Sequence, residues 1–288
     1  MAYKASPRPV FDGPAPIPYG SVTRHIWGDE EAGLVADWIY VSSDKIHQLV
    51  FGLPPGQGFT HSESFRTVFA ADEVLTVLQG RMVIANPETG EVCPVERGES
   101  VFFRRDTWHH AWAWGEEELR VLEYFAPPPS TGSSGKYAQT RPYISAPRYE
   151  RSAFIGRWPE ARAAAQAAAT LTVLRDADRL WSLDPTDPRV LTGITASTEH
   201  LTAGTVRLRP GGRSQTLAHG GAAGLYVVAG RVNILIEDEA AAPPVWFELH
   251  PHDGFYVPEG SRYRAFNMGG TPAEYLFGVA PHYHADAR

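Results

Sequence analysis

The chain has 288 residues, of which 43% are hydrophobic and 20% charged, a composition typical of a globular protein with one large domain or two ordinary ones. The net charge of −7 and the lack of a Lys/Arg cluster argue against nucleic-acid binding and favour small-molecule chemistry. Cys93 is the only cysteine, which excludes an internal disulfide framework or a thiolate metal cluster and fits a reducing cytoplasm.

Residues 1–35 are predicted to form an N-terminal arm. Its first half, MAYKASPRPVFDGPAPIPYG, is Pro-rich and has no apolar stretch like that of a secretory signal. No run in the chain approaches the roughly 18 apolar residues of a membrane helix. These features predict a cytoplasmic protein that does not bind membranes.

Residues 36–126 are predicted to form a first β-barrel. Short apolar or alternating runs bounded by Gly, Pro, Asn or Asp predict strands. These runs are residues 36–41, 46–53, 73–79, 81–85, 99–103, 109–114 and 119–125. The intervening NPETGE, residues 86–91, is typical of a hairpin tip.

A linker with a short helix is predicted over residues 127–170. The stretch APPPSTGSSGK, residues 126–136, is Pro-rich and then Gly/Ser-rich, which is typical of a linker. Residues 158–170 (WPEARAAAQAAAT) are rich in alanine and have Pro159 near their start, which predicts a helix.

Residues 171–288 are predicted to form a second barrel. Its strands are expected over residues 204–209, 225–229, 231–236, 245–249, 254–257, 262–267 and 273–279. The order of features repeats that of the first half: a Pro-Gly turn, a His, a strand ending in Gly, a hairpin and an aromatic strand. The duplication predicts an all-β fold of two barrels or sandwiches of about 100 residues each.

Four residues of the first barrel have the types and spacing of metal ligands. His61 and Glu63 are two residues apart and share a face of a regular strand. Glu73 lies on the next strand and His109 on a later one. Two imidazoles and one carboxylate converging from three strands leave open metal positions for a substrate or O2. Fe, Mn, Ni and Zn all suit such ligands.

These residues resemble the double motif of the cupin superfamily, G-x5-H-x-H-x3–4-E-x6-G followed by G-D-x4-P-x-G-x2-H-x3-N. Pro55-Gly56 leads into His61, Glu63 replaces the second His, Glu73 is the Glu, Gly80 the final Gly, and His109 the His of GESVFFRRDTWHH. The resemblance implies two double-stranded β-helix (jelly-roll) barrels, a bicupin, and a homodimer.

The match departs from the motif at two places, which leaves the carboxylate ligand open. The interval from His61 to Glu73 is several residues too long, and Arg104 and Asp106 stand where Pro and Gly are usual. Glu63 and Glu73 could each bind the metal, act beside it or serve in acid–base catalysis. His110, on the strand face opposite His109, is the alternative imidazole and a further candidate catalytic residue.

Strand alternation predicts what surrounds His109. With His109 inside the barrel, Ala111 and Ala113 share its face and leave space for a substrate, whereas His110 and the Trp pair 112 and 114 lie outside. Candidate substrate-binding residues near the motif are Arg66, Arg81, Arg104 and Trp108. As a group, the cations suggest an anionic substrate.

The second barrel is predicted to have lost its metal ligands. Pro258, Gly260 and Asn267 match the family motif and His219 is present, but Ala223 stands at the Glu position and Tyr263 at the final His position. One imidazole does not hold a divalent metal against water.

The leading functional hypothesis is a non-haem Fe(II) dioxygenase that acts with O2 on a small aromatic or carboxylated substrate; bicupins include such enzymes. Two alternatives are a redox-neutral isomerase, lyase or cyclase, in which the metal is a Lewis acid and Glu63 or Glu73 moves the proton, and a non-catalytic metabolite-binding protein.

Overall fold

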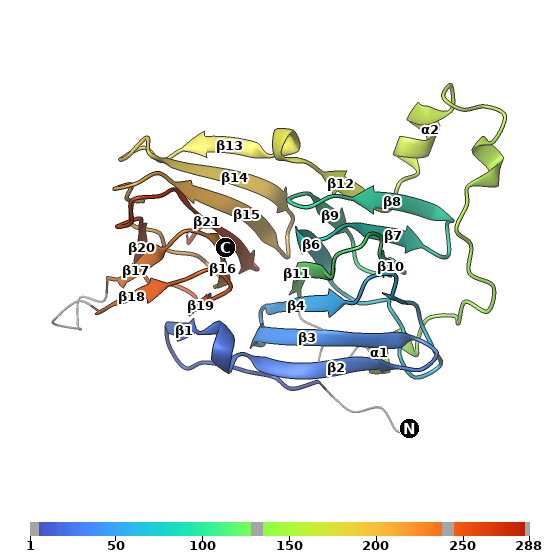
Figure 1. The fold of residues 1–288 in the computed structure, drawn as a ribbon, viewed down its shortest axis with the longest axis horizontal. Helices are drawn as coiled ribbons and strands as arrows, with labels where there is room; N and C mark the ends of the chain where they lie inside the picture. The colour runs from blue at the N-terminus through green and yellow to red at the C-terminus, as the bar shows by residue number, and fades with distance from the viewer. Residues whose placement is uncertain (1–5, 128–134, 238–244, 286–288) are drawn as a thin grey trace.

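The computed structural model describes residues 6–127, 135–237 and 245–285. These residues form two β-barrels that lie side by side (Figure 1). Short helical segments occur at Tyr19–Ser21 (η1), Gly135–Ala138 (α1), Ser152–Phe154 (η3), Arg162–Ala167 (α2) and Asp176–Asp178 (η4). The all-β fold of two barrels predicted from the sequence is therefore confirmed. No helix within the described ranges is long and apolar enough to cross a membrane.

The N-terminal barrel is built from two antiparallel sheets around one hydrophobic core. The larger sheet contains, in spatial order, β12 (Thr172–Leu174), β9 (Ser100–Phe103), β6 (Asp72–Gln79), β11 (Leu119–Ala126), β4 (His47–Leu53), β3 (Gly33–Ser42) and β2 (Thr23–Asp29). The smaller sheet contains β5 (Gly58–Phe59), β10 (His110–Ala113), β7 (Met82–Asn86) and β8 (Glu91–Val95). Alternate strand residues enter the core, as Leu75 and Val77 do on β6.

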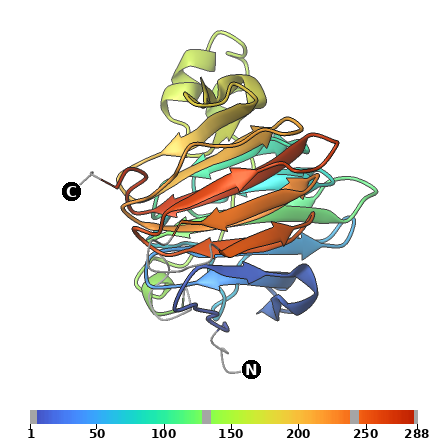
Figure 2. The same ribbon diagram turned by 90° about the vertical axis from the view of Figure 1, so that its left-hand side faces the viewer.

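The C-terminal barrel repeats this arrangement, and Figure 2, turned by 90° from Figure 1, shows its strands at the front. Its larger sheet contains β1 (Ala15–Ile17), β19 (Gly254–Val257), β16 (Ala222–Ala229), β21 (Ala273–Ala280), β15 (Thr202–Leu208), β14 (Val190–Ser197) and β13 (Leu180–Leu183). Its smaller sheet contains β18 (Val245–Leu249), β17 (Val232–Ile236) and β20 (Tyr263–Phe266).

The two halves exchange strands, so the barrel boundaries differ from those predicted. β1, in the predicted N-terminal arm, pairs with β19 of the C-terminal barrel, and β2 joins the N-terminal barrel before its predicted start at residue 36. β12 lies after the predicted boundary at residue 171 but pairs with β9 of the N-terminal barrel. Both exchanges pair segments far apart in sequence, which local periodicity does not reveal.

The predicted helix over residues 158–170 is shorter in the structure. Only α2, Arg162–Ala167, is helical, and it buries Ala165 alone. A short exposed helix gains little from packing, and its N-cap residue Ala161 makes no side-chain cap. The predicted hairpin tip at residues 86–91 does connect β7 with β8. Residues 128–134 of the predicted linker lie outside the described residues.

The barrels dock through the outer faces of their larger sheets. Apolar side chains of β3, β4, β6 and β11 form one buried cluster with those of β15, β16, β19 and β21. Three side chains also donate hydrogen bonds to carbonyls of the C-terminal barrel: Tyr40 to His252 (2.6 Å), Gln48 to Leu225 (3.1 Å) and Tyr124 to Gly224 (3.1 Å). The interface is therefore an extension of the core.

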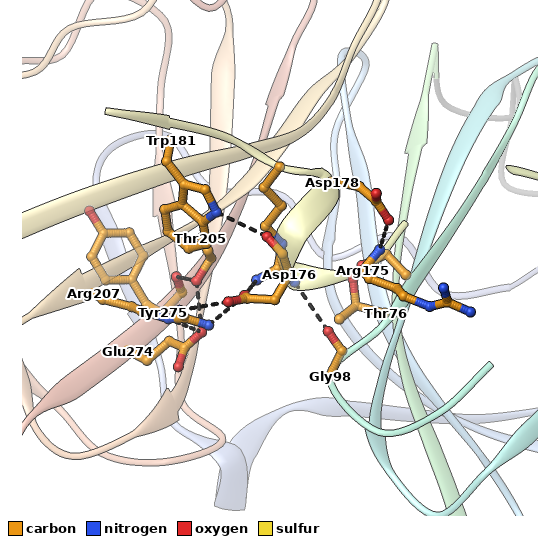
Figure 3. Close-up of polar contacts among 12 residues, drawn as sticks. Thr76, Gly98, Arg175, Asp176, Asp178, Trp181, Thr205, Arg207, Glu274 and Tyr275 are labelled. Atoms are coloured by element: carbon orange, nitrogen blue, oxygen red, sulfur yellow. Dashed lines mark hydrogen bonds and ion pairs between the residues drawn. The ribbon is translucent and has the colours of Figure 1, made fainter. Parts of the chain in front are cut away.

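Arg179 connects the barrels beside this interface, between Gly98 and Asp176, which Figure 3 labels. Its guanidinium donates hydrogen bonds to the Gly98 carbonyl of the N-terminal barrel (3.1 Å) and to Asp176 (2.6 Å). Asp176 also pairs with Arg207 on β15 at 2.7 Å. The connection from β12 to β13 is thus held by polar groups from both halves.

Candidate metal centre

Three buried side chains converge inside the N-terminal barrel: Glu73 on β6, Glu123 on β11 and His109 just before β10. Each carboxylate takes an inward position among the apolar core residues of its strand. Glu73 alternates with Leu75 and Val77 of the core, and Glu123 follows Leu119 and Val121 in the same alternation. The sheet register therefore places both carboxylates in the barrel interior.

The ligand atoms of the three residues all lie within 4.8 Å of one another. His109 Nε2 lies 4.0 Å from Glu73 Oε2, and the exposed fractions of Glu73, His109 and Glu123 are 1%, 3% and 6%. The carboxyl groups of Glu73 and Glu123 are close enough to act on each other's pKa. Two carboxylates in contact repel each other, so the pair favours retention of a proton.

Burial controls the charge state of this group. Desolvation, followed by the charge of Glu123, raises the pKa of Glu73 well above its usual value. Desolvation also raises the pKa of Glu123 to about 8, with a further contribution from Asp37. It lowers the pKa of His109 to about 4, so this imidazole is neutral at pH 7. Without a metal, the group contains a neutral imidazole and a carboxyl pair that retains a proton.

The donor set fits a divalent metal ion. A neutral imidazole and two carboxylates are ligands of Zn, Fe and Mn. Glu73 Oε2 is buried and has no hydrogen-bond partner within the described part of the chain, which leaves a costly unpaired acceptor that a cation would satisfy. Ligands bonded at about 2.1 Å can be at most about 4.2 Å apart, and the 4.0 Å between His109 and Glu73 lies within that limit.

Aromatic rings enclose His109. Phe69 stacks on its imidazole with centroids 5.7 Å apart, and Phe59 and Phe103 contact it at 5.9 Å and 4.8 Å. Ala111 and Ala113 lie in the same core, as strand alternation predicts for an inward His109. This apolar surround excludes water and strengthens electrostatic interactions at the group.

His61 and His110, predicted as a ligand and a catalytic residue, lie outside this group and form a separate pair. His61 Nε2 donates to the Ile144 carbonyl at 3.0 Å, so its Nδ1 accepts from His110 Nε2 at 2.7 Å. His110 Nδ1 in turn accepts from the Tyr149 hydroxyl at 2.9 Å. The pair binds the segment that follows α1 to the outside of the barrel.

The other predicted site residues make contacts away from the group. Glu63 is exposed and pairs with Arg66 at 2.8 Å. Arg66 is buried and also donates to the Arg141 carbonyl, and Trp108 packs against Val68 and the segment after α1. Arg81 pairs with Glu96 at 2.6 Å, and Arg104 pairs with Asp72 and with Glu199 of the C-terminal barrel. Trp112, on the outer face, contacts the Tyr149 ring.

The structure indicates that the family motif is aligned by counting back from Glu73, not by placing its first His at His61. No lengthened interval is then needed. Counted back from Glu73 with the family spacing x3, the two His positions fall on Thr67 and Phe69. Both residues are next to His109: the Thr67 carbonyl accepts its backbone N–H at 3.1 Å, and Phe69 stacks on its ring. The chain thus has no imidazole at these positions, and Glu123 is the third member of the group.

A Phe69→His variant should bind divalent metal more tightly than the natural chain. It would place a second imidazole beside His109 and create a two-His set with Glu73. We expect at least a tenfold decrease in the dissociation constant for Zn, measured by competition with a chelating dye. Phe102→His, on the outer face of β9, is the matched control. An equal gain for both variants would contradict this register.

The corresponding region of the C-terminal barrel has different chemistry. His219 donates from Nδ1 to the Tyr283 carbonyl at 2.6 Å and accepts the Tyr263 hydroxyl at Nε2, 3.0 Å away. Ala223, at the family's Glu position, lies in the apolar core.

Comparison with known proteins finds the same duplication, with one match in each half of the chain. The family model described as "Cupin domain" matches residues 50–125 and 204–279, which together cover more than half of the chain. No curated protein matches the sequence.

Solved structures match nearly the whole chain at low identity. A Pseudomonas aeruginosa protein described as glyoxylate-induced has a TM-score of 0.64 and 15% identity over 97% of this chain and 93% of its own. Lactobacillus farciminis oxalate decarboxylase, in a formate complex, has a TM-score of 0.61 and 13% identity, with coverage of 93% and 87%. AerE from Microcystis aeruginosa has a TM-score of 0.58 and 8% identity, with coverage of 90% and 97%. At these identities the likeness concerns the fold alone.

Proposed function

This chain belongs to the cupin domain family as a bicupin, and we propose that it is a metal-dependent enzyme whose active site is the interior of the N-terminal barrel. One observation carries the proposal: Glu73, His109 and Glu123 are buried together with their ligand atoms within 4.8 Å. Buried acidic groups are costly unless they are paired or bind a metal. Three protein ligands also leave metal positions open for a small substrate.

We propose a non-haem Fe(II) dioxygenase as the first reaction class. A bound Fe(II) ion would supply electron transfer between substrate and O2. His109, Glu73 and Glu123 would hold the ion through one neutral imidazole and two carboxylates. Phe59, Phe69 and Phe103 keep water away from it and fit an aromatic or other apolar substrate body. Mn, Ni and Zn are the alternative ions.

A second reaction class, a redox-neutral lyase or isomerase, is supported by Asp37 and His25. Asp37 alternates with Val35 and Ile39 of the barrel core, and its carboxylate lies 3.3 Å from His25 Nδ1. Desolvation raises the pKa of Asp37, and its charge acts on Glu123. The pair can therefore move a proton close to the metal group without being a ligand.

Metal analysis of variants tests the site. We expect anaerobically prepared protein to contain close to one divalent ion per chain. His109→Asn and Glu123→Gln should each reduce this metal content at least tenfold, because each variant loses a ligand. His61→Asn, a buried imidazole outside the group, is the matched control and should retain the ion. Thermal unfolding of each variant would show that it is folded.

The opposite pattern, with loss of the ion in His61→Asn and retention in His109→Asn, would contradict the assignment. Oxygen uptake by the metal-loaded protein with a panel of small carboxylates and phenols then separates the two reaction classes. Turnover with O2 consumption supports the dioxygenase, and turnover unchanged under anaerobic conditions supports the lyase or isomerase.

A further inference from the structure

The C-terminal barrel contains a cavity of about 200 Å³, separate from the metal group. Buried Tyr275, Tyr263 and His219 form its inner wall, and Gln215, Leu183 and His284 lie at its exposed rim. An engineered apolar cavity of about 150 Å³ is large enough to bind benzene. The cavity therefore has room for one ring with a small substituent and is open to solvent on one side.

The Tyr275 hydroxyl is an unused hydrogen-bonding group in this wall. Tyr275 is 1% exposed, and its hydroxyl has no partner within the described residues. Figure 3 shows its ring pointing away from the charged group formed by Asp176, Arg207 and Glu274. A buried hydroxyl without a partner costs free energy, so a ligand atom bonded to it would gain that bond without displacing another protein contact.

The neighbouring hydroxyl, that of Tyr263, already makes a hydrogen bond within the protein. Because the Tyr283 carbonyl only accepts, His219 Nδ1 carries the proton in their 2.6 Å bond. His219 Nε2 is then an acceptor, and the Tyr263 hydroxyl donates to it at 3.0 Å. Tyr275 is therefore the tyrosine of the inner wall with a free proton to donate.

The charges around the cavity select against anions. Among the described residues that line it, none is Lys or Arg. Asp184 is also in the lining, and its carboxylate accepts hydrogen bonds from the Thr186 and Gln215 backbone N–H groups at 2.8 Å and 2.7 Å. A carboxylate or phosphate ligand would meet a negative charge without a cation to compensate it.

We propose that this cavity is a binding site for a small uncharged molecule, about one ring in size, whose carbonyl or amide oxygen accepts a hydrogen bond from Tyr275. The apolar body of the ligand would pack against Val190, Val206 and Phe277. This site is independent of the metal group, and it gives the second barrel a role in recognition.

Benzamide, benzoate and toluene test the proposal, with binding to the full chain followed by NMR titration. They share one ring but differ in charge and in hydrogen-bonding ability. We expect benzamide to bind more tightly than benzoate. We also expect Tyr275→Phe to weaken benzamide binding roughly 3- to 10-fold, the effect of one lost hydrogen bond, and to leave toluene binding unchanged.

Two variants locate the effect. Tyr256→Phe removes a hydroxyl elsewhere in the C-terminal barrel and should not alter benzamide binding. His109→Asn alters the metal group and should also leave it unchanged, which separates this site from the N-terminal barrel. Tighter binding of benzoate than benzamide, equal benzamide affinity in Tyr275→Phe, or loss of binding in His109→Asn would each overturn the proposal.

Discussion

The metal-free protein should lose stability as the pH rises from about 6.5 to about 8. Burial raises the pKa of Glu123 to about 8, so the folded state retains a proton in this range that the unfolded state has released. The free energy of unfolding then falls by up to about 1.4 kcal/mol per pH unit for one proton, or about 2 kcal/mol over the interval.

The decline in stability begins at about pH 6.5 because, below that pH, buried histidines make the free energy of unfolding rise with pH. Burial lowers the pKa values of His47 and His109 to about 4. Between about pH 4 and 6.5 the unfolded state binds these protons and the folded state does not, so stability rises with pH there. A maximum near pH 6.5 is therefore expected.

Thermal unfolding across this pH range in the presence of a chelator measures the effect. The double variant Glu73→Gln with Glu123→Gln should flatten the decline above pH 6.5, because both carboxyls have raised pKa values. Glu91→Gln, a buried carboxyl outside the barrel core, should not. Added divalent metal should also flatten it, because the ion replaces the shared proton. A flat profile in the metal-free natural chain would refute the assigned protonation.

Gly278→Ala should destabilise the protein by about 2–3 kcal/mol, through the interface between the barrels. A Cβ added at Gly278 would lie 2.4 Å from Cδ1 of Tyr124, whose ring is buried and whose hydroxyl is bonded to the Gly224 carbonyl. Overpacking of this kind costs about 1–3 kcal/mol, and displacement of the ring would add the loss of its hydrogen bond, about 1 kcal/mol.

Urea denaturation measures this change. Gly270→Ala is the matched control, because a Cβ there would meet no atom within 4 Å, and it should unfold at almost the same urea concentration as the natural chain. Equal midpoints for the two variants would show that the barrels are not packed as closely as the glycines of β16 and β21 indicate.

Most strands were predictable because apolar runs and the alternation of apolar and polar residues are properties of the local sequence. Every predicted strand range overlaps an observed strand, from β3 to β21. The missed strands are short, lie at sheet edges or lack a strong apolar pattern, as in β5 (Gly58–Phe59) and β13 (Leu180–Leu183). Their pairing depends on partners that only the tertiary fold supplies.

The metal group was predictable in part. Glu73 and His109 follow from the motif, and the structure brings them together. Glu123 was missed, although a charged residue at an inward position between Val121 and Phe125 was a signal in the strand alternation. Spacing also did not show that the chain leaves the barrel after Phe59, so that His61 faces His110 and Ile144.

The exchange of β1 and β12 between the barrels also has a consequence for synthesis on the ribosome. β1 is made before the strands of the N-terminal barrel, but its partner β19 is made only after β13 to β18. β1 therefore stays without its partner strand until the N-terminal barrel and most of the C-terminal barrel have been made. A gene divided at the linker would encode two products, each of which carries one edge strand of the other.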